Sequence, residues 1–453
     1  MTGNELATAY LDLVRRNGDR PSALLGPIAE VKELEAFFKG RYLPCPMFLT
    51  APEHAQLTQD LTNLRSALVS LPDRLFGGDL AAFARAVGMT EPQADMAARG
   101  RAAEVTRFAR ADVLAVPGGF KVVEFNMGSA LGGLDIAELA RAMVRHPTLA
   151  GFAADHGLEF TDTRVEVLHT MFAETGVAQD TDPFVAIVDS PGSFAGLGEY
   201  LQRAAETWDE KYGIRAGACH LGDLEYRDGA VWLRGQRVDV VYRTFILENL
   251  VTRPHEIEVM APLMAAAERG EVRVFTPLDA EAFASKNALA MVADGANRAL
   301  FTPEEQVSLG RLLPWTRILA DGEATLETGE TVDLVEYALK NRGDLVLKPT
   351  LMHGGIGVVL GSDPHVTQEY WEQQIRQSLD GTFTVQRLIR PEPDYFPTED
   401  GELDPYTVMW GVFTVTRGYG GMFGRATRNT GSTTGVISMA TGAMAVACLH
   451  ATR

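Results

Sequence analysis

Two segments in which apolar and polar residues alternate, separated by Pro117-Gly118-Gly119, place the strongest constraint on the fold of this chain. They span residues 108–126, FARADVLAVPGGFKVVEFN. Alternation with a period of two on both sides of a Pro-Gly-Gly turn predicts a β-hairpin. If these three residues form the loop, Val116 faces Phe120.

Four polar side chains then align across the predicted hairpin. Counting outward from the turn places Asp112 opposite Glu124, and Arg110 opposite Asn126. Carboxylates that face each other on a sheet repel, and Mg²⁺ offsets that repulsion because it accepts Asp, Glu and Asn oxygens. A loop of two or four residues would instead send Asp112 and Glu124 to opposite faces of a solvated hairpin.

The bulk composition is that of a globular protein with several packed units. A chain of 453 residues suggests two to four such units, and its 46% hydrophobic and 22% charged content is ordinary. The net charge of −19, without a basic block, argues against a broad nucleic-acid surface. An anionic small molecule would need a few cations gathered locally.

The cysteines and the apolar pattern indicate the cytoplasm and no membrane anchor. Cys45, Cys219 and Cys448 are too far apart for a disulfide framework or a metal motif, so we expect buried, inert thiols. The first twenty residues read as a charged amphipathic helix rather than a secretory signal. No apolar stretch approaches the length of a membrane span.

The pattern along the chain predicts four regions and a mixed α/β (α+β) fold. Residues 1–105 place apolar residues three or four apart and read as a helical N-terminal region, accessory or substrate-capping. The hairpin and a following helix occupy 106–160. Residues 161–284 alternate helices with strands, as a Rossmann-like α/β unit does, and 285–453 hold strands interrupted by Gly-rich loops.

One of those loops has the composition of a phosphate-binding flap. The segment LVLKPTLMHGGIGVVLG carries Lys348 at the end of an apolar strand and then Gly354, Gly355 and Gly357. Glycines let successive backbone N–H groups turn toward an anion. The spacing is not that of a Walker loop, and an ordinary Gly-rich hairpin is the competing interpretation.

Three further polar residues follow in the C-terminal third. Gln386 begins QRLIRPEP, an extended stretch that either borders a nucleotide base or is an ordinary sheet strand. Arg425 and Arg428 are expected in a Gly-rich loop, GGMFGRATR, facing either solvent or an anion. The nine histidines include no zinc-hydrolase motif.

Taken in order, these segments resemble the circularly permuted ATP-grasp ligases, the group typified by the synthetase domain of glutathionylspermidine synthase. An acidic hairpin comes early, and lysine-bearing strands and a Gly-rich flap come late. The matching pieces are R-x-D (Arg110, Asp112), E-x-N (Glu124, Asn126), VDVVYR (238–243), SKN (Lys286), LVLKP with GGIG (Lys348, Gly354, Gly355, Gly357), VQRL (Gln386 to Leu388) and GRATR (Arg425).

The resemblance implies a role for each matching residue. In this interpretation the region 106–160 completes the site, and 285–453 forms the ATP-grasp nucleotide-binding lobes beside a Rossmann-like pre-ATP-grasp domain. The implied roles are Mg²⁺ ligands (Asp112, Glu124, Asn126), stabilisation of an acyl-phosphate (Arg110), nucleotide-phosphate binding (Lys286, Lys348, Gly354, Gly355, Gly357), a border to the adenine (Gln386, Leu388) and a late phosphate contact (Arg425).

The implied activity is ATP- and Mg²⁺-dependent amide formation between a carboxylate and an amine through an acyl-phosphate. Amino acids, peptides and polyamines are all plausible substrates, and the identity of the substrate does not transfer from the family. The first hundred residues and the Met352-His353 pair before the flap glycines depart from the family pattern. Two other classes compete: a small-molecule phosphotransferase using the same ATP site, and a non-catalytic nucleotide-binding protein.

Overall fold

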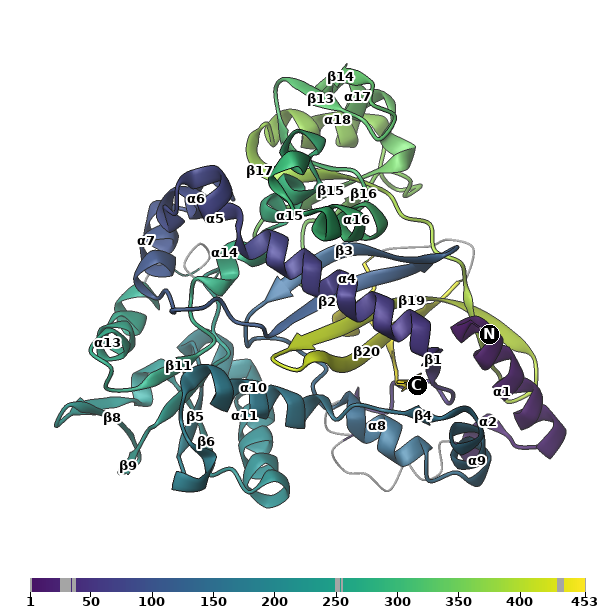
Figure 1. Cartoon of the computed structure of the whole chain (residues 1–453), viewed down its shortest axis with the longest axis horizontal. Coiled ribbons are helices and arrows are strands. Elements are labelled where there is room, and N and C mark those ends of the chain that lie inside the picture. The colour runs from purple at the N-terminus through teal and green to yellow at the C-terminus, as the bar shows by residue number, and fades with distance from the viewer. Residues whose placement is uncertain are drawn as a thin grey trace.

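The hairpin forms and makes one edge of an antiparallel sheet at the centre of the molecule (Figure 1). The structure, a computed structural model, describes residues 2–24, 34, 38–248, 253, 256–429 and 436–452. The sheet has the order β21-β20-β19-β2-β3, with β18 beside β19. Its strands are β2 (Ala109–Val116), β3 (Gly119–Met127), β18 (Asp394–Pro397), β19 (Leu403–Val415), β20 (Gly418–Arg428) and β21 (Met444–Val446).

The turn of the hairpin is one residue shorter than expected. Val116 pairs with Gly119, and Phe120 pairs with Ala115, so the predicted pairing of Val116 with Phe120 is wrong. Only Pro117 and Gly118 form the loop. Gly118 has φ +81°, a conformation that follows proline naturally in a tight turn.

A β-bulge corrects the register before the acidic residues are reached. Val113 pairs with Val122, whereas Asp112 pairs with Glu124, so Val123 is an extra residue on β3. A two-residue turn alone would place the carboxylates on opposite faces. The turn is one residue shorter than expected, and the bulge adds one residue to β3, so the two differences cancel. The expected pairing of Asp112 with Glu124 is therefore confirmed.

The late Gly-rich segment is a strand and not a loop. Arg425 and Arg428 both lie within β20, and the expectation that they occupy a loop is wrong. Gly424 packs so closely on Met47 and Val446 that a Cβ there would overlap both side chains. Glycine in this strand therefore marks close packing between layers.

A second, smaller antiparallel sheet forms a lobe above the central sheet (green, Figure 1). Its order is β12-β17-β15-β16, and helices α17 and α18 cover a separate apolar core that includes Trp315, Leu347 and Trp371. The elements of this region are α14 (Ala280–Ala284), α15 (Lys286–Ala293), α16 (Pro303–Leu312), β12 (Thr316–Ala320), β13 (Glu323–Thr325), β14 (Thr331–Asp333), α17 (Leu334–Lys340), β15 (Leu345–Pro349), β16 (Val359–Leu360), α18 (Gln368–Gln377) and β17 (Asp380–Arg387).

A parallel sheet of order β11-β10-β5-β6 forms the third unit (teal, Figure 1), as the alternating pattern predicted. Asp228-Gly229 and Arg234-Gly235, all at positive φ, make the two turns of a small meander between its strands. The elements are α10 (Thr163–Thr175), β5 (Val185–Asp189), α11 (Pro191–Tyr212), β6 (Ala216–His220), β7 (Glu225–Arg227), β8 (Ala230–Leu233), β9 (Gln236–Arg237), β10 (Val240–Arg243), α13 (Glu256–Glu268) and β11 (Arg273–Phe275).

The first hundred residues are mostly helical, as expected, and also contain a strand. β1 (Met47–Leu49) pairs in parallel with β22 (Cys448–Ala451), which pairs on its other side with β4 (Leu158–Glu159). Residues 25–33 and 35–37 of this region lie outside the described residues. The helices are α1 (Gly3–Asn17), α2 (Pro21–Leu24), α4 (Ala51–Val69), α5 (Leu71–Phe76), α6 (Leu80–Ala86) and α7 (Glu91–Arg99), followed after the hairpin by α8 (Ile136–Met143) and α9 (Pro147–His156).

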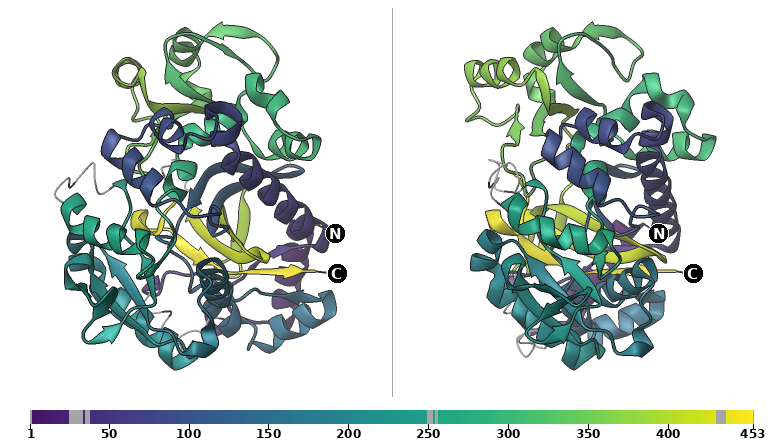
Figure 2. Two further views of the ribbon diagram at one scale, coloured as in Figure 1. Left: turned by 60° about the vertical axis from the view of Figure 1, so that its left-hand side comes forward. Right: turned by 90° about the vertical axis from the view of Figure 1, so that its left-hand side faces the viewer.

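The upper lobe and the parallel-sheet unit lie on opposite sides of the central sheet (Figure 1). Figure 2 shows, from two further sides, the green lobe above the central sheet and the teal unit below it. The three cysteines are buried and free, as expected. No helix among the described residues is long and apolar enough to cross a membrane.

Candidate functional site

A cavity of about 850 Å³ lies between the central sheet and the upper lobe, and residues of both sheets line it. Its volume is that of a small-molecule or cofactor site. The residues predicted from the sequence converge here from five segments of the chain. Those that line the cavity are Arg110, Asp112, Glu124, Asn126, Lys286, Lys348, Gly354, Gly355, Gln386, Leu388 and Arg425; Gly357 is not among the lining residues.

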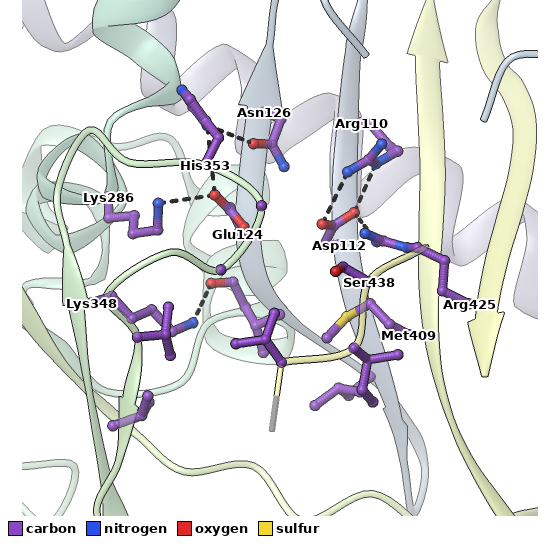
Figure 3. A pocket seen from close by; sticks show the side chains of 18 of the residues that line it. Arg110, Asp112, Glu124, Asn126, Lys286, Lys348, His353, Met409, Arg425 and Ser438 are labelled. Carbon is purple, nitrogen blue, oxygen red and sulfur yellow. Dashed lines mark hydrogen bonds and ion pairs between the residues drawn. The ribbon is translucent and has the colours of Figure 1, made fainter. Parts of the chain in front are cut away.

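Asp112 is held by two guanidinium groups on the floor of this cavity (Figure 3). Nε of Arg110 lies 2.9 Å from Oδ1 of Asp112, and a nitrogen of Arg425, from β20, lies 2.6 Å from the same oxygen. Burial by itself would raise the pKa of Asp112, but the two arginines outweigh it and hold that pKa below its usual value. Asp112 is therefore ionised and fixed.

Glu124 faces a different cation. Nζ of Lys286, the first residue of α15, lies 2.9 Å from Oε1 of Glu124, and Nδ1 of His353 lies 3.9 Å from it. Burial would raise the pKa of Glu124, yet Lys286 and His353 together hold it well below its usual value. Both carboxylates of the hairpin are thus paired with cations: Asp112 with one from its own strand and one from β20, and Glu124 with one from α15.

Asn126 pairs across the hairpin with Arg110, as the sequence predicted. Its Oδ1 lies 3.3 Å from Nδ1 of His353, and its Nδ2 is buried without a hydrogen-bond partner among the described residues. A buried amide nitrogen without a partner is costly in a closed core. In a cavity it is a group that a ligand can satisfy.

Lys348, at the end of β15, reaches the cavity from the upper lobe. Its Nζ donates to the carbonyl oxygen of Val123 at 2.8 Å and to Oε1 of Gln386 at 2.7 Å. Burial above all, opposed by Glu124 and Asp112 and reinforced by the nearby Lys286, lowers the pKa of Lys348 to about 8. The bulge residue thus also serves as an acceptor that joins the two sheets.

The Gly-rich segment between β15 and β16 turns over the mouth of the cavity. Gly354, Gly355 and Gly357 all have positive φ, between +66° and +81°, which explains why glycine occupies them. A Cβ at Gly355 would overlap the side chain of Val436. Ile356, at the tip, is 62% exposed.

The side chains around the cavity fit a magnesium triphosphate. Among the lining residues predicted from the sequence, Lys286, Lys348, Arg110 and Arg425 bring four positive charges and Asp112 and Glu124 bring two negative ones, so these six carry a net +2 that would meet phosphate oxygens. The two carboxylates and the Asn126 amide are oxygen donors of the kind Mg²⁺ accepts. Among the described residues there is no cluster of three or more His, Cys, Asp or Glu placed to hold a metal, so an amide or phosphate oxygens would complete the set.

The sequence alone indicated no role for several groups around the cavity. His353 comes directly before the flap glycines, and that position is its only sign in the sequence of a place in the site. Arg243 is fully buried on β10 and binds Glu281, and both line the cavity. Arg243 ends VDVVYR, a segment noted for its resemblance, whereas Glu281 has no signal in the sequence at all.

Comparison with known proteins agrees with this geometry. The sequence model of a family described as "a circularly permuted ATPgrasp" matches residues 71–386. Among curated protein sequences, none matches this chain. The fold is similar to that of a glutathione synthetase-like effector from Globodera pallida, with a TM-score of 0.54 and 13% identity over 98% of this chain and 96% of that one.

A weaker likeness links the chain to a solved structure from Methylobacillus flagellatus described as a γ-glutamylcysteine synthetase, with a TM-score of 0.41 and 12% identity over 88% of this chain and 87% of that one. The family match spans more than half of the chain and includes the hairpin, both lysines and the flap. The chain therefore belongs to the circularly permuted ATP-grasp family and is an ATP-dependent ligase.

Proposed function

We propose that this protein joins a small-molecule carboxylate to an amine, such as an amino acid, peptide or polyamine, through an acyl-phosphate formed from ATP. The observation that carries the proposal is the convergence of a paired-carboxylate hairpin with four cations, from four different elements, in one cavity. Phosphoryl transfer depends chiefly on positioning and on neutralising phosphate charge, and these residues do both.

Asp112, Glu124 and Asn126 would hold Mg²⁺, which when bound neutralises charge on the phosphate oxygens. Lys286 and Lys348 would bind the nucleotide phosphates, and Arg425 would contact the transferred group. Arg110 lies beside Asp112 and would stabilise the oxyanion that develops when the amine attacks. The flap at Gly354–Gly357 would exclude water, which would otherwise hydrolyse the acyl-phosphate.

Incubation with Mg-ATP and pools of amino acids, peptides and polyamines tests the proposal by phosphate release and product mass. We expect ADP, phosphate and a product whose mass equals acid plus amine minus water. A stable phosphorylated product made without any amine would instead identify a phosphotransferase. Absence of any ATP-dependent product across the pools would favour a non-catalytic nucleotide-binding protein.

Two variants test the residues. Asp112→Asn and Glu124→Gln should each lower ATP-dependent phosphate release at least roughly a hundredfold, because each removes a charged ligand of the Mg²⁺ that would position the triphosphate. Circular dichroism and thermal melting check that the fold persists. Glu305→Gln, which lies outside the cavity and is bound to Arg74, is a matched control for a lost carboxylate. Turnover at the normal rate in both hairpin variants would contradict the assignment.

A further inference from the structure

We propose that Gln386 positions the ammonium group of Lys348 for the nucleotide phosphates, and that Thr316 fixes the orientation of the Gln386 amide. The inference rests on the proposed ATP-dependent function and deepens it. It differs from the role that the family resemblance implies for Gln386, which is a border to the adenine.

The register of the small sheet brings the three side chains together. β17 lies between β12 and β15, and Gln386 on β17 pairs with Thr316 on one side and with Val346 on the other. Lys348 follows Val346 by two residues, so both point to the same face of the sheet. Diagonal neighbours on one face are within reach of long side chains.

Hydrogen bonds then determine which end of the amide faces the lysine. Oγ1 of Thr316 donates its only proton to the carbonyl oxygen of Pro314 at 3.0 Å. The same hydroxyl therefore accepts from Nε2 of Gln386, 3.0 Å away. The amide oxygen is left on the opposite side, where it accepts from Nζ of Lys348 at 2.7 Å. An ammonium group has only donors, so this is the one orientation that satisfies both neighbours.

Burial makes the arrangement rigid. Thr316 is 1% exposed and Gln386 is 2% exposed. Water does not reach them, so breaking either hydrogen bond would leave a buried polar group without a partner, which costs free energy. Both ends of the Gln386 amide are engaged within the protein. An amide committed in this way is poorly placed to read the edge of a base.

The second acceptor of Lys348 comes from the other sheet. Val123, the bulge residue of β3, receives the ammonium group on its carbonyl oxygen at 2.8 Å. Two of the three ammonium protons are thus directed to oxygens held by two different sheets. The third proton remains for a phosphate oxygen, and its direction is fixed because the other two are.

The test measures how Gln386→Met changes the affinity for two ligands. Titration calorimetry gives the affinity for a Mg-bound, non-hydrolysable ATP analogue, and competition with that analogue gives the affinity for adenosine. Methionine keeps the length of the side chain and removes the acceptor. We expect the affinity for the ATP analogue to fall roughly tenfold, the usual effect of losing a hydrogen bond to a charged group. The affinity for adenosine, which has no phosphate, should not change.

A double-mutant cycle separates positioning from a direct contact. In a Lys348→Met background, Gln386→Met should have no further effect on ATP-analogue binding, because the group that it positions is gone. Additive losses, or an equal loss of adenosine affinity, would overturn the inference. A wild-type protein that binds neither ligand would overturn the proposed function itself, and the inference with it.

Conservative variants keep the test valid if Gln386→Met melts early. Thr316→Val removes the hydroxyl that orients the amide and should weaken ATP-analogue binding several-fold, whereas Thr316→Ser should bind as the wild type does. Gln386→Glu retains an acceptor for Lys348 but loses the donor to Thr316 and adds a negative charge beside the phosphate site, so it should weaken binding at least as much as Gln386→Met. Thr316→Val that binds ATP analogue normally would count against the proposed orientation.

Discussion

A buried histidine and a half-buried one, both away from the cavity, show how a single residue affects the pH range over which this protein is stable. The rings of His54 on α4 and His450 on β22 stack with their centroids 4.5 Å apart. Nε2 of His54 and Nδ1 of His450 are buried without hydrogen-bond partners among the described residues. Burial, and then the neighbouring His54, lower the pKa of His450 to about 4, and burial also lowers the pKa of His54.

Stability should therefore fall in mild acid. The folded state keeps His450 neutral, whereas the unfolded chain protonates it near pH 6.5, so the stabilising contribution is complete above pH 6.5 and is lost as the pH falls toward 4. The free energy of unfolding should drop by about 2 kcal/mol between pH 7 and pH 5 from this residue alone. Urea unfolding at the two pH values measures it.

His450→Gln is the matched control for this prediction, because glutamine has no titrating group and keeps a polar atom near Thr161. The variant should show a smaller loss of stability between pH 7 and pH 5 than the wild type. An equal loss in both proteins would assign the acid sensitivity to other groups.

At this scale the sequence singled out residues that the fold brings to one cavity, but not what each one touches. Side-chain type and strand spacing were enough to single out Asp112, Glu124 and Lys348. Their partners depend on distant segments: Arg425 lies more than 300 residues from Asp112 along the chain and comes to it through the β2–β19–β20 pairing. Pairing of that kind leaves no local signal.

At the scale of elements, the hairpin shows how a correct pairing can follow from an incorrect turn. The sequence predicted a three-residue loop, and the structure has a two-residue loop and a bulge at Val123. A bulge has no reliable signature when its residue is an ordinary valine between valine and glutamate. β20 shows the converse, since its glycines suggested a loop but serve close packing on Met47.

Deleting Val123 should lower activity while leaving the hairpin paired. A continuous ladder from the two-residue turn then pairs Val113 with Val122 and Asp112 with Glu124, so the carboxylates stay opposite each other, but the bulge carbonyl that accepts from Lys348 is lost. ATP-dependent phosphate release should fall roughly tenfold, as expected for the loss of one hydrogen bond to a charged group. Activity assays with ATP and circular dichroism measure the two effects.

Val123→Ala is the control for that deletion. It keeps the bulge and the backbone carbonyl that accepts from Lys348, and it removes only two methyl groups of a residue outside the buried core. The variant should retain activity within a fewfold of the wild type. Loss of activity in Val123→Ala as severe as in the deletion would mean that the side chain, not the bulge carbonyl, matters.

At the scale of the whole molecule, the two ends of the chain are fastened together. β1 and β22 pair although about 400 residues separate them, and Phe48 and Leu449, which pair directly, are each at most 2% exposed. Strands of three or four residues give almost no periodic signal, so this pairing could not be predicted from the sequence. The N-terminal helices are consequently part of the main apolar core.

A chain that ends after Ala447 should lose much of its stability. It lacks β22, and losing the buried Leu449 alone should cost roughly 2–5 kcal/mol. A chain that ends after Ala451 keeps the strand and should melt close to the wild type. Thermal melting of the two truncated chains measures the difference, and equal melting temperatures would show that β22 contributes little.

The contacts across the cavity have a consequence for how a nucleotide enters. Lys286 is bound to Glu124 and Lys348 to the backbone of the bulge, so each ammonium group that would receive the ligand also ties the cavity wall to the central sheet. A phosphate oxygen that meets the third proton of Lys348 would leave that tie in place, whereas at Lys286 it would compete with Glu124 for the ammonium group. A nucleotide can therefore load while Lys348 still holds the two sheets together.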